Sequence, residues 1–89
     1  MRVLKWPLRL DESEQKVGGG RIALIDTQSA NSGQPVVWTL EAGYEPESYR
    51  TVRVYGTGQA IPDDWGHVGS VNAPPFVWHI FEKPVTSGD

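Results

Sequence analysis

The sequence predicts a single all-β domain, built as a small antiparallel barrel or a strongly curved sheet of five to six strands. Apolar and polar residues alternate in short runs, which is the pattern of strands that bury one face. Ten glycines and seven prolines separate these runs in a chain of 89 residues, and this composition is typical of turns rather than long helices. Because a chain of this length has room for one hydrophobic core, we expect one domain over residues 1–82 and a flexible C-terminal tail over residues 83–89.

The first predicted strand is the run VLKWPLRL, in which every second residue is apolar. Pro7 cannot donate a hydrogen bond to a neighbouring strand, so we expect this strand at a sheet edge or with a bulge. The next ten residues, DESEQKVGGG, are charged and end in three glycines, and we expect a loop there. The residues of the first strand that should face the core are Leu4, Trp6, Leu8 and Leu10.

Three further strands are predicted in RIALIDTQ, PVVWTLEA and YRTVRVYG, separated by the turn-rich stretches SANSGQ and GYEPES. In the third of these strands, the side that carries Arg53 and Tyr55 is expected to face solvent. The residues expected to point into the core are Ile22, Leu24, Val36, Trp38, Leu40, Val52 and Val54.

The last predicted hairpin joins HVGSV to FVWHIFE through NAPP. Val77, His79 and Phe81 make the second face of the closing strand largely apolar. Since such a strand is either central in its sheet or covered by a partner, we place the last hairpin near the centre of the sheet. The core residues expected from this hairpin are Val71, Phe76, Trp78 and Ile80.

Composition narrows the functional classes. The chain has no cysteine, which excludes disulfides and thiolate metal sites and favours a reducing compartment, the cytoplasm. Eight Lys and Arg against eleven Asp and Glu give a net charge of −3, so we expect no nucleic-acid partner. The opening MRVLKWPLRLDE has no unbroken apolar stretch, and no run reaches the ~18 apolar residues of a membrane helix, so we expect no targeting segment and no membrane contact.

The stretch YGTGQAIPDDWGHVG contains the residue types of several kinds of site. Its Gly-Thr-Gly lacks the Lys-Ser/Thr pair and the helix of a phosphate loop, so we interpret it as a turn. Asp64, His67 and His79 are weak candidates for a metal site, because the last hairpin would bring both histidines onto neighbouring strands. These three lack a spacing signature, and Ser70 lacks the following glycine of a nucleophile elbow. We therefore expect no catalytic residues, no metal and no cofactor.

Trp65 is the large apolar residue of this turn-rich stretch, and it would either plug the end of a barrel or stand at a binding surface. The residues expected to contact a protein partner are Trp65, Tyr55, His79 and Phe81. The partner would be a host protein or a second copy of the chain. A homodimer is an open alternative to a monomer, because burying an apolar face would help a core this small.

Several motifs point to a family: a KWPL opening, YGTG at the end of an Arg-containing strand, an IP turn, HVGSV and the closing FVWHIFE, together spanning Lys5 to Glu82. With these motifs the chain resembles short bacteriophage proteins that carry a domain of unknown function. Members have His after the GTG, where this chain has Gln59. The resemblance implies a phage origin and an overall shape rather than a function. Together with the net negative charge, the apolar second face of FVWHIFE and the lack of a convergent catalytic set, a phage origin leads us to expect a non-enzymatic interaction protein that modulates host or anti-phage defence proteins in the host cytoplasm. The alternatives are a minor structural or assembly component of the phage, or a small metal- or nucleotide-binding protein.

Overall fold

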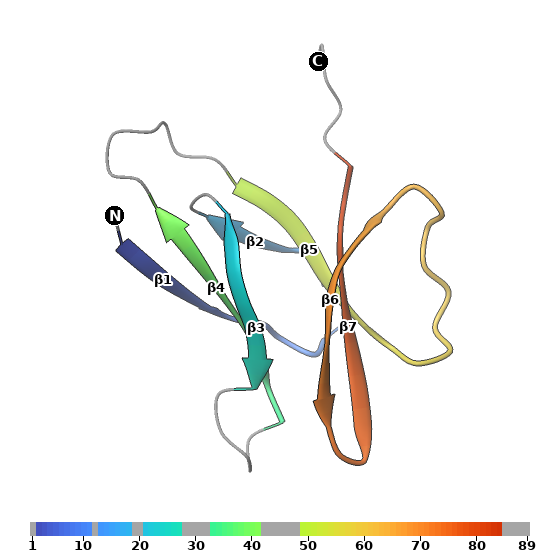
Figure 1. Cartoon of the computed structure of the whole chain (residues 1–89). Coiled ribbons are helices and arrows are strands. Elements are labelled where there is room, and N and C mark those ends of the chain that lie inside the picture. Colours follow the sequence, from blue (N-terminus) through green and yellow to red (C-terminus); the bar gives the residue numbers. More distant parts are fainter. Residues whose placement is uncertain (1, 12, 19–20, 28–32, 42–48, 85–89) are drawn as a thin grey trace.

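The part of the chain that the computed structural model describes forms seven strands in two antiparallel sheets (Figure 1). The structure describes residues 2–11, 13–18, 21–27, 33–41 and 49–84, and no helix occurs in these ranges, which confirms the all-β class. The strands form two sheets rather than one closed barrel or one curved sheet, and their number exceeds the expected five to six. They are β1 (Arg2–Pro7), β2 (Gln15–Gly18), β3 (Ile22–Thr27), β4 (Pro35–Glu41), β5 (Tyr49–Gly56), β6 (Gly66–Ala73) and β7 (Phe76–Glu82).

The first sheet has three strands in the order β1-β4-β3. β1 pairs with β4 from Arg2 opposite Glu41 to Pro7 opposite Val36. Pro7 is therefore the last residue of an edge strand, where its missing N–H is tolerated, as predicted. At the other end, exposed Arg2 and half-buried Glu41 form an ion pair, and the hydrogen bond to Glu41 raises the pKa of the Arg2 guanidinium.

The second sheet has four strands in the order β2-β5-β7-β6. β7 lies between β5 and β6, so both of its sides are hydrogen-bonded, whereas β6 is an edge strand. The expected central place of the last hairpin is therefore correct for β7 and wrong for β6.

The segment expected to be a loop, residues 11–20, contains β2, so that expectation is wrong. β2 pairs antiparallel with β5, and its Gln15 and Val17 are buried while the residue between them is exposed. Gln15 can be buried because its amide is fully engaged with the backbone of Arg9. Its Oε1 accepts from the Arg9 N–H at 2.6 Å and its Nε2 donates to the Arg9 carbonyl at 2.8 Å. A polar residue thus fills a core-facing position of the strand.

The hydrophobic core lies between the two sheets and takes residues from both. The half-buried side chains of Trp6, Ile22, Ile25, Val68 and Trp78 pack against it. The predicted core positions in β5 and β6 are confirmed, as are Ile80 of β7 and Leu8. The buried members of the core are Leu8, Val17, Val37, Val52, Val54, Val71 and Ile80.

β3 differs from its predicted alternation because of a bulge. The pairing of β3 with β4 shifts between Ile22 and Leu24, and Leu24 is 53 % exposed instead of buried. Ile25 turns inward in its place and faces Gly69 of β6. A Cβ at position 69 would lie 2.7 Å from Ile25 Cδ1, so the glycine lets the edge strands of the two sheets approach each other.

β4 turns a different face to the core from the one expected. Val37 belongs to the core, whereas Trp38 and Leu40 are only half-buried. Val36 is buried but lies outside the main core cluster. The expectation was wrong because β4 is the central strand of its sheet, and both of its faces carry apolar residues.

Thr39, on the core-facing side of β4, connects the two sheets through its buried hydroxyl. Trp6 Nε1 of β1 donates to Thr39 Oγ1 at 3.1 Å, and Thr39 Oγ1 donates to the carbonyl of Gly18 in β2 at 2.9 Å. β1 and β4 belong to the three-stranded sheet and β2 to the other. The Thr39 hydroxyl therefore links the two sheets by hydrogen bonds inside their apolar interface.

In the segment expected to be a tail, the backbone N–H of Lys83 donates to the Thr51 carbonyl at 2.8 Å. Residues 85–89 of that segment and the turn expected in GYEPES lie outside the described residues, as does most of the turn expected in SANSGQ.

Candidate functional site

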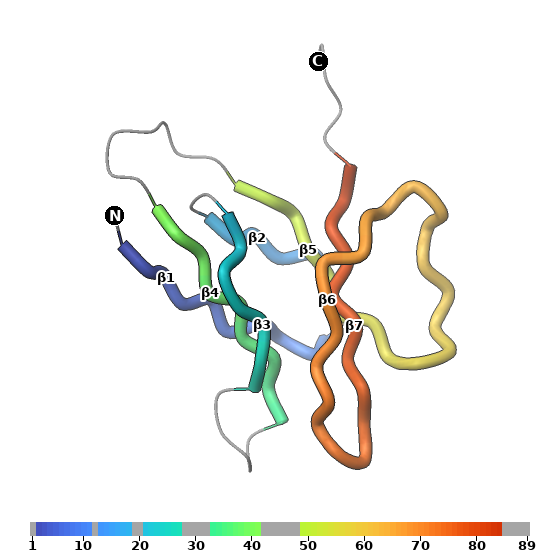
Figure 2. Tube along the Cα trace, in the orientation of Figure 1, coloured from blue at the N-terminus to red at the C-terminus, as the bar shows by residue number. Residues whose placement is uncertain are grey.

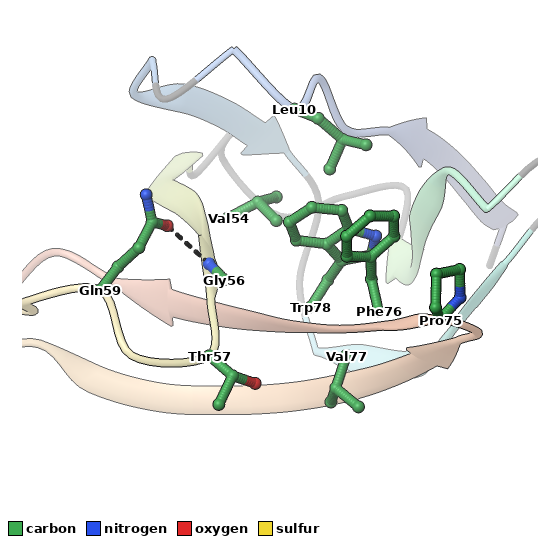
Figure 3. Close-up of a pocket in the computed structure, with 9 residues that line it drawn as sticks. All are labelled: Leu10, Val54, Gly56, Thr57, Gln59, Pro75, Phe76, Val77 and Trp78. Atoms are coloured by element: carbon green, nitrogen blue, oxygen red, sulfur yellow. Dashed lines mark hydrogen bonds between the residues drawn. The ribbon is translucent and has the colours of Figure 1, made fainter.

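A pocket of about 450 Å³ opens where the turn of the β6–β7 hairpin approaches the end of β5 and the segment after β1 (Figure 3). This volume lies within the range of small-ligand pockets, about 300 to 1,000 Å³. No lining residue is charged, and only Thr57 and Gln59 bring polar side chains. The pocket is lined by Leu10, Val54, Gly56, Thr57, Gln59, Pro75, Phe76, Val77 and Trp78.

Two stacked aromatic rings form the main wall of the pocket. The ring centroids of Phe76 and Trp78 are 5.3 Å apart at an interplanar angle of 25°, and Figure 3 shows both rings below Leu10. Phe76 is 55 %, Leu10 46 % and Val77 40 % exposed. The expectation that Leu10 and Phe76 are buried in the core is therefore wrong. Both residues have the inward orientation, but each lies at the end of its run, where the other sheet does not cover it.

Gly56 keeps the pocket open beside Trp78, its partner in the β5–β7 register. A Cβ on Gly56 would lie 3.5 Å from Trp78 Cζ3, so any longer side chain would extend over the ring. Gln59 folds back onto Gly56. The side-chain Oε1 of Gln59 accepts from the Gly56 N–H at 2.6 Å, and the backbone N–H of Gln59 donates to the Gly56 carbonyl at 3.2 Å. Gly58 has a φ of 93°, which favours glycine. The predicted turn at Gly-Thr-Gly is thus confirmed.

The opposite face of the four-stranded sheet carries an aromatic cluster, formed by Tyr55, Trp65, His67 and Phe81. The Tyr55 ring makes edge contacts with Trp65 (6.2 Å, 88°) and Phe81 (5.9 Å, 89°), and the His67 ring is 5.1 Å from Phe81. Figure 2 shows the wide loop between β5 and β6 whose end supplies Trp65. This cluster covers Tyr55, which is 2 % exposed. Tyr55, expected on a solvent-facing side, is therefore buried, and half-buried Trp65 forms part of its cover.

Arg53 adds a cation to this cluster. Its Cζ lies 4.8 Å from the centroid of the Tyr55 ring, a cation–π distance. Its buried Nε has no hydrogen-bond partner among the described residues. The Arg53 guanidinium is thus in contact with the face of the Tyr55 ring.

A hydrogen-bonded chain of four side chains runs beside the aromatic cluster. Ser70 Oγ lies 3.0 Å from His67 Nε2 and 2.8 Å from His79 Nδ1, and His79 Nε2 lies 3.0 Å from Thr57 Oγ1. The two histidines of the predicted metal candidates are thus linked through Ser70. Asp64 is exposed in the loop, and no group of three His, Cys, Asp or Glu among the described residues is arranged to hold a metal ion.

The turn that contains Asp63 and Asp64 is closed by a backbone hydrogen bond from the Trp65 N–H to the Pro62 carbonyl at 3.1 Å. Both aspartates are exposed. The two aspartates therefore lie in an exposed turn that leads into Trp65.

Of the four residues expected to contact a protein partner, Tyr55, Trp65 and Phe81 lie together in the aromatic cluster, and His79 belongs to the adjoining hydrogen-bonded chain. The pocket on the other side was not foreseen. The sequence feature that indicates the pocket is that Leu10 and Phe76 stand at the ends of apolar runs, next to Asp11 and Pro75. At such positions a strand extends beyond the sheet that covers it.

A family model for a domain of unknown function, DUF7352, matches residues 1–88 of the chain. No curated protein and no solved structure matches it. Among the described residues, no helix has the length and apolar character needed to span a membrane. With nearly every residue covered by the family model, the chain belongs to the DUF7352 family.

Proposed function

We propose that the protein is a small, non-enzymatic interaction module, encoded by a bacteriophage, that binds a host or anti-phage defence protein in the host cytoplasm. The observation that supports this most directly is the uncharged aromatic pocket, with Leu10, Phe76 and Val77 exposed around it. Exposed apolar residues gathered at a concave site are typical of binding surfaces. The motif resemblance to short phage proteins supports the proposed origin.

The segment of the partner that enters the pocket is an uncharged stretch of polypeptide with a large apolar side chain. A charged group would lose its water there without gaining an ion pair, because no lining residue is charged. Phe76 and Trp78 present ring surface to an aliphatic or aromatic side chain. Gln59 brings an amide to the rim of the pocket that suits one peptide group of the same segment, whereas the side chain of Thr57 points away from the two rings (Figure 3).

Peptide selection tests this occupant. Peptides selected from a random yeast-displayed library by the wild-type chain should be uncharged and rich in large apolar residues. The best one is then titrated by calorimetry against Gly56→Leu, which fills the pocket, and Trp78→Ala, which removes a wall. Both changes should weaken binding about tenfold or more, since the loss of a hot-spot contact at the centre of an interface costs about 2 kcal/mol or more.

Leu24→Ser and Val3→Ser are the matched controls, because these apolar residues are similarly exposed but lie outside the pocket. They should bind the peptide like the wild type. Equal binding by Gly56→Leu, or the selection of charged peptides, would contradict the proposed pocket.

The same variants identify the cellular partner. A host protein captured from lysate by the wild type and by Leu24→Ser, and lost with Gly56→Leu, would support the proposal. The absence of any reproducible partner at micromolar protein would count against it. Concentration-dependent self-association that Gly56→Leu abolishes would show instead that a second copy of the chain occupies the pocket.

A further inference from the structure

Two imidazole rings on neighbouring strands converge on one hydroxyl. His67 Nε2 and His79 Nδ1 lie 3.0 Å and 2.8 Å from Ser70 Oγ. In a regular strand, His67 and Ser70 would face opposite sides, because three positions separate them. A register shift between His67 and Gly69 places both on the face that carries His79. The bulge in β6 is therefore what brings the two histidines together.

The hydrogen bond to Thr57 orients His79 for metal binding. His79 Nε2 lies 3.0 Å from Thr57 Oγ1, and in the tautomer that donates this hydrogen bond the lone pair is on Nδ1, facing Ser70. Histidines that bind metals usually donate their other ring N–H to such a partner. The exposed His67 ring contacts Phe81, with 5.1 Å between the ring centroids.

The hydroxyl of Ser70 has one proton and can donate to only one of the two facing nitrogens. A divalent cation that displaced the hydroxyl would be bound by both. Ser70, His67 and Thr57 are exposed and His79 is half-buried, so a cation can reach the rings from solvent. The net charge of −3 favours its approach.

We propose that His67 Nε2 and His79 Nδ1 form a two-imidazole site for a late first-row divalent cation, with Zn²⁺ as the reference ion. Because both nitrogens lie within 3.0 Å of Ser70 Oγ, His67 Nε2 and His79 Nδ1 are at most about 5.8 Å apart. Two Zn–N bonds of about 2.0 to 2.1 Å in tetrahedral geometry need the nitrogens roughly 3.4 Å apart. Rotation of the exposed His67 ring into the place of the displaced hydroxyl closes this difference, while the hydrogen bond to Thr57 keeps the His79 ring in place. Water completes the coordination, and imidazole ligands select Zn²⁺, Ni²⁺ and Cu²⁺ over Mg²⁺.

Calorimetric titration of the untagged full chain with Zn²⁺ in a non-chelating buffer tests the site. We expect one ion per chain, tighter binding of Cu²⁺ than of Zn²⁺, and no heat with Mg²⁺. His67→Ala and His79→Ala should each abolish Zn²⁺ binding. Thr57→Val should weaken it about tenfold, because loss of such an orienting partner commonly costs 10 to 100-fold in metal affinity.

Asp64→Asn is the control that separates this site from one that uses the loop carboxylate, and it should bind Zn²⁺ like the wild type. Circular dichroism and the urea midpoint verify that each variant is folded. As an independent readout, Cu²⁺ should broaden the NMR signals of both histidine rings before those of other residues. Unchanged Zn²⁺ affinity in either histidine variant, loss of binding in Asp64→Asn, or no binding of Zn²⁺ or Cu²⁺ by the folded wild type would overturn the proposal.

Discussion

Replacing Thr39 by valine tests whether one buried hydroxyl holds the two sheets together. Valine keeps the size and the β-branched shape of threonine, so the change removes the hydroxyl and little else. Two hydrogen bonds are lost, the one from Trp6 Nε1 at 3.1 Å and the one to the Gly18 carbonyl at 2.9 Å. Each contributes about 1 kcal/mol net, and a buried group left without its partner costs about 1 to 3 kcal/mol. We expect the free energy of unfolding to fall by about 2 to 3 kcal/mol.

Urea denaturation followed by tryptophan fluorescence measures this loss, and Tm should fall by roughly 10 °C or more for a domain of this size. Thr39→Ser is the control, since it keeps the hydroxyl and removes one methyl group, at a cost of about 1 kcal/mol. The reasoning is refuted if the valine variant is as stable as the wild type, or if the serine variant is the less stable of the two.

Three other substitutions test separate features of the fold. Gly69→Ala should lower the free energy of unfolding by about 1 kcal/mol, because the new methyl group would clash with Ile25 Cδ1. In the background of Ile25→Val, which lacks that atom, the same change should cost much less, and a double-mutant cycle measures the difference. Gln15→Met should cost about 2 kcal/mol in urea denaturation, because the buried amide makes two backbone hydrogen bonds. The hydrogen bond from Ser13 lowers the pKa of Asp11, so Ser13→Ala should raise that pKa in an NMR titration. The stabilising contribution of Asp11 is present above its unfolded-state pKa and is lost as the pH falls through the lower folded-state value.

The sequence predicted the core best where strands are regular. In β5 and β7, strict alternation identified Val52, Val54 and Ile80, and all three are buried. Alternation fails at bulges, because one extra residue reverses the inward and outward sides beyond it. Leu24 was assigned to the wrong side for this reason. The same effect in β6 concealed that His67 shares a face with Ser70.

β2 was missed for another reason. Its apolar content is low, and Gln15 occupies an inward position that pattern reading assigns to an apolar residue. The side chain is compatible with burial only because the Arg9 backbone satisfies both ends of its amide, a contact six positions away in the chain. Such pairings depend on the path of the chain between the strands, and residue types alone do not specify it.

The pocket could not be predicted because it depends on how far each sheet covers the other. Leu10 and Phe76 have the periodicity of core residues, and only the end of the opposing sheet decides that they are exposed. The aromatic face was easier to predict, since Phe81 and His79 share the outward parity of one strand. Even there, the burial of Tyr55 required Trp65 to fold back from a loop.

The two apolar faces of FVWHIFE now have different explanations. On the face with Phe81, the rings of Tyr55 and His67 contact Phe81, and Trp65 contacts Tyr55, so side chains of the same chain cover part of this face. The face with Trp78 runs from the core into an open pocket, which is the surface that we propose for the partner segment. Thr57 borders the pocket, but its side chain points to the other side of the sheet and contacts His79 (Figure 3). Substituting the Thr57 side chain should therefore affect metal binding, whereas Gly56→Leu should affect peptide binding.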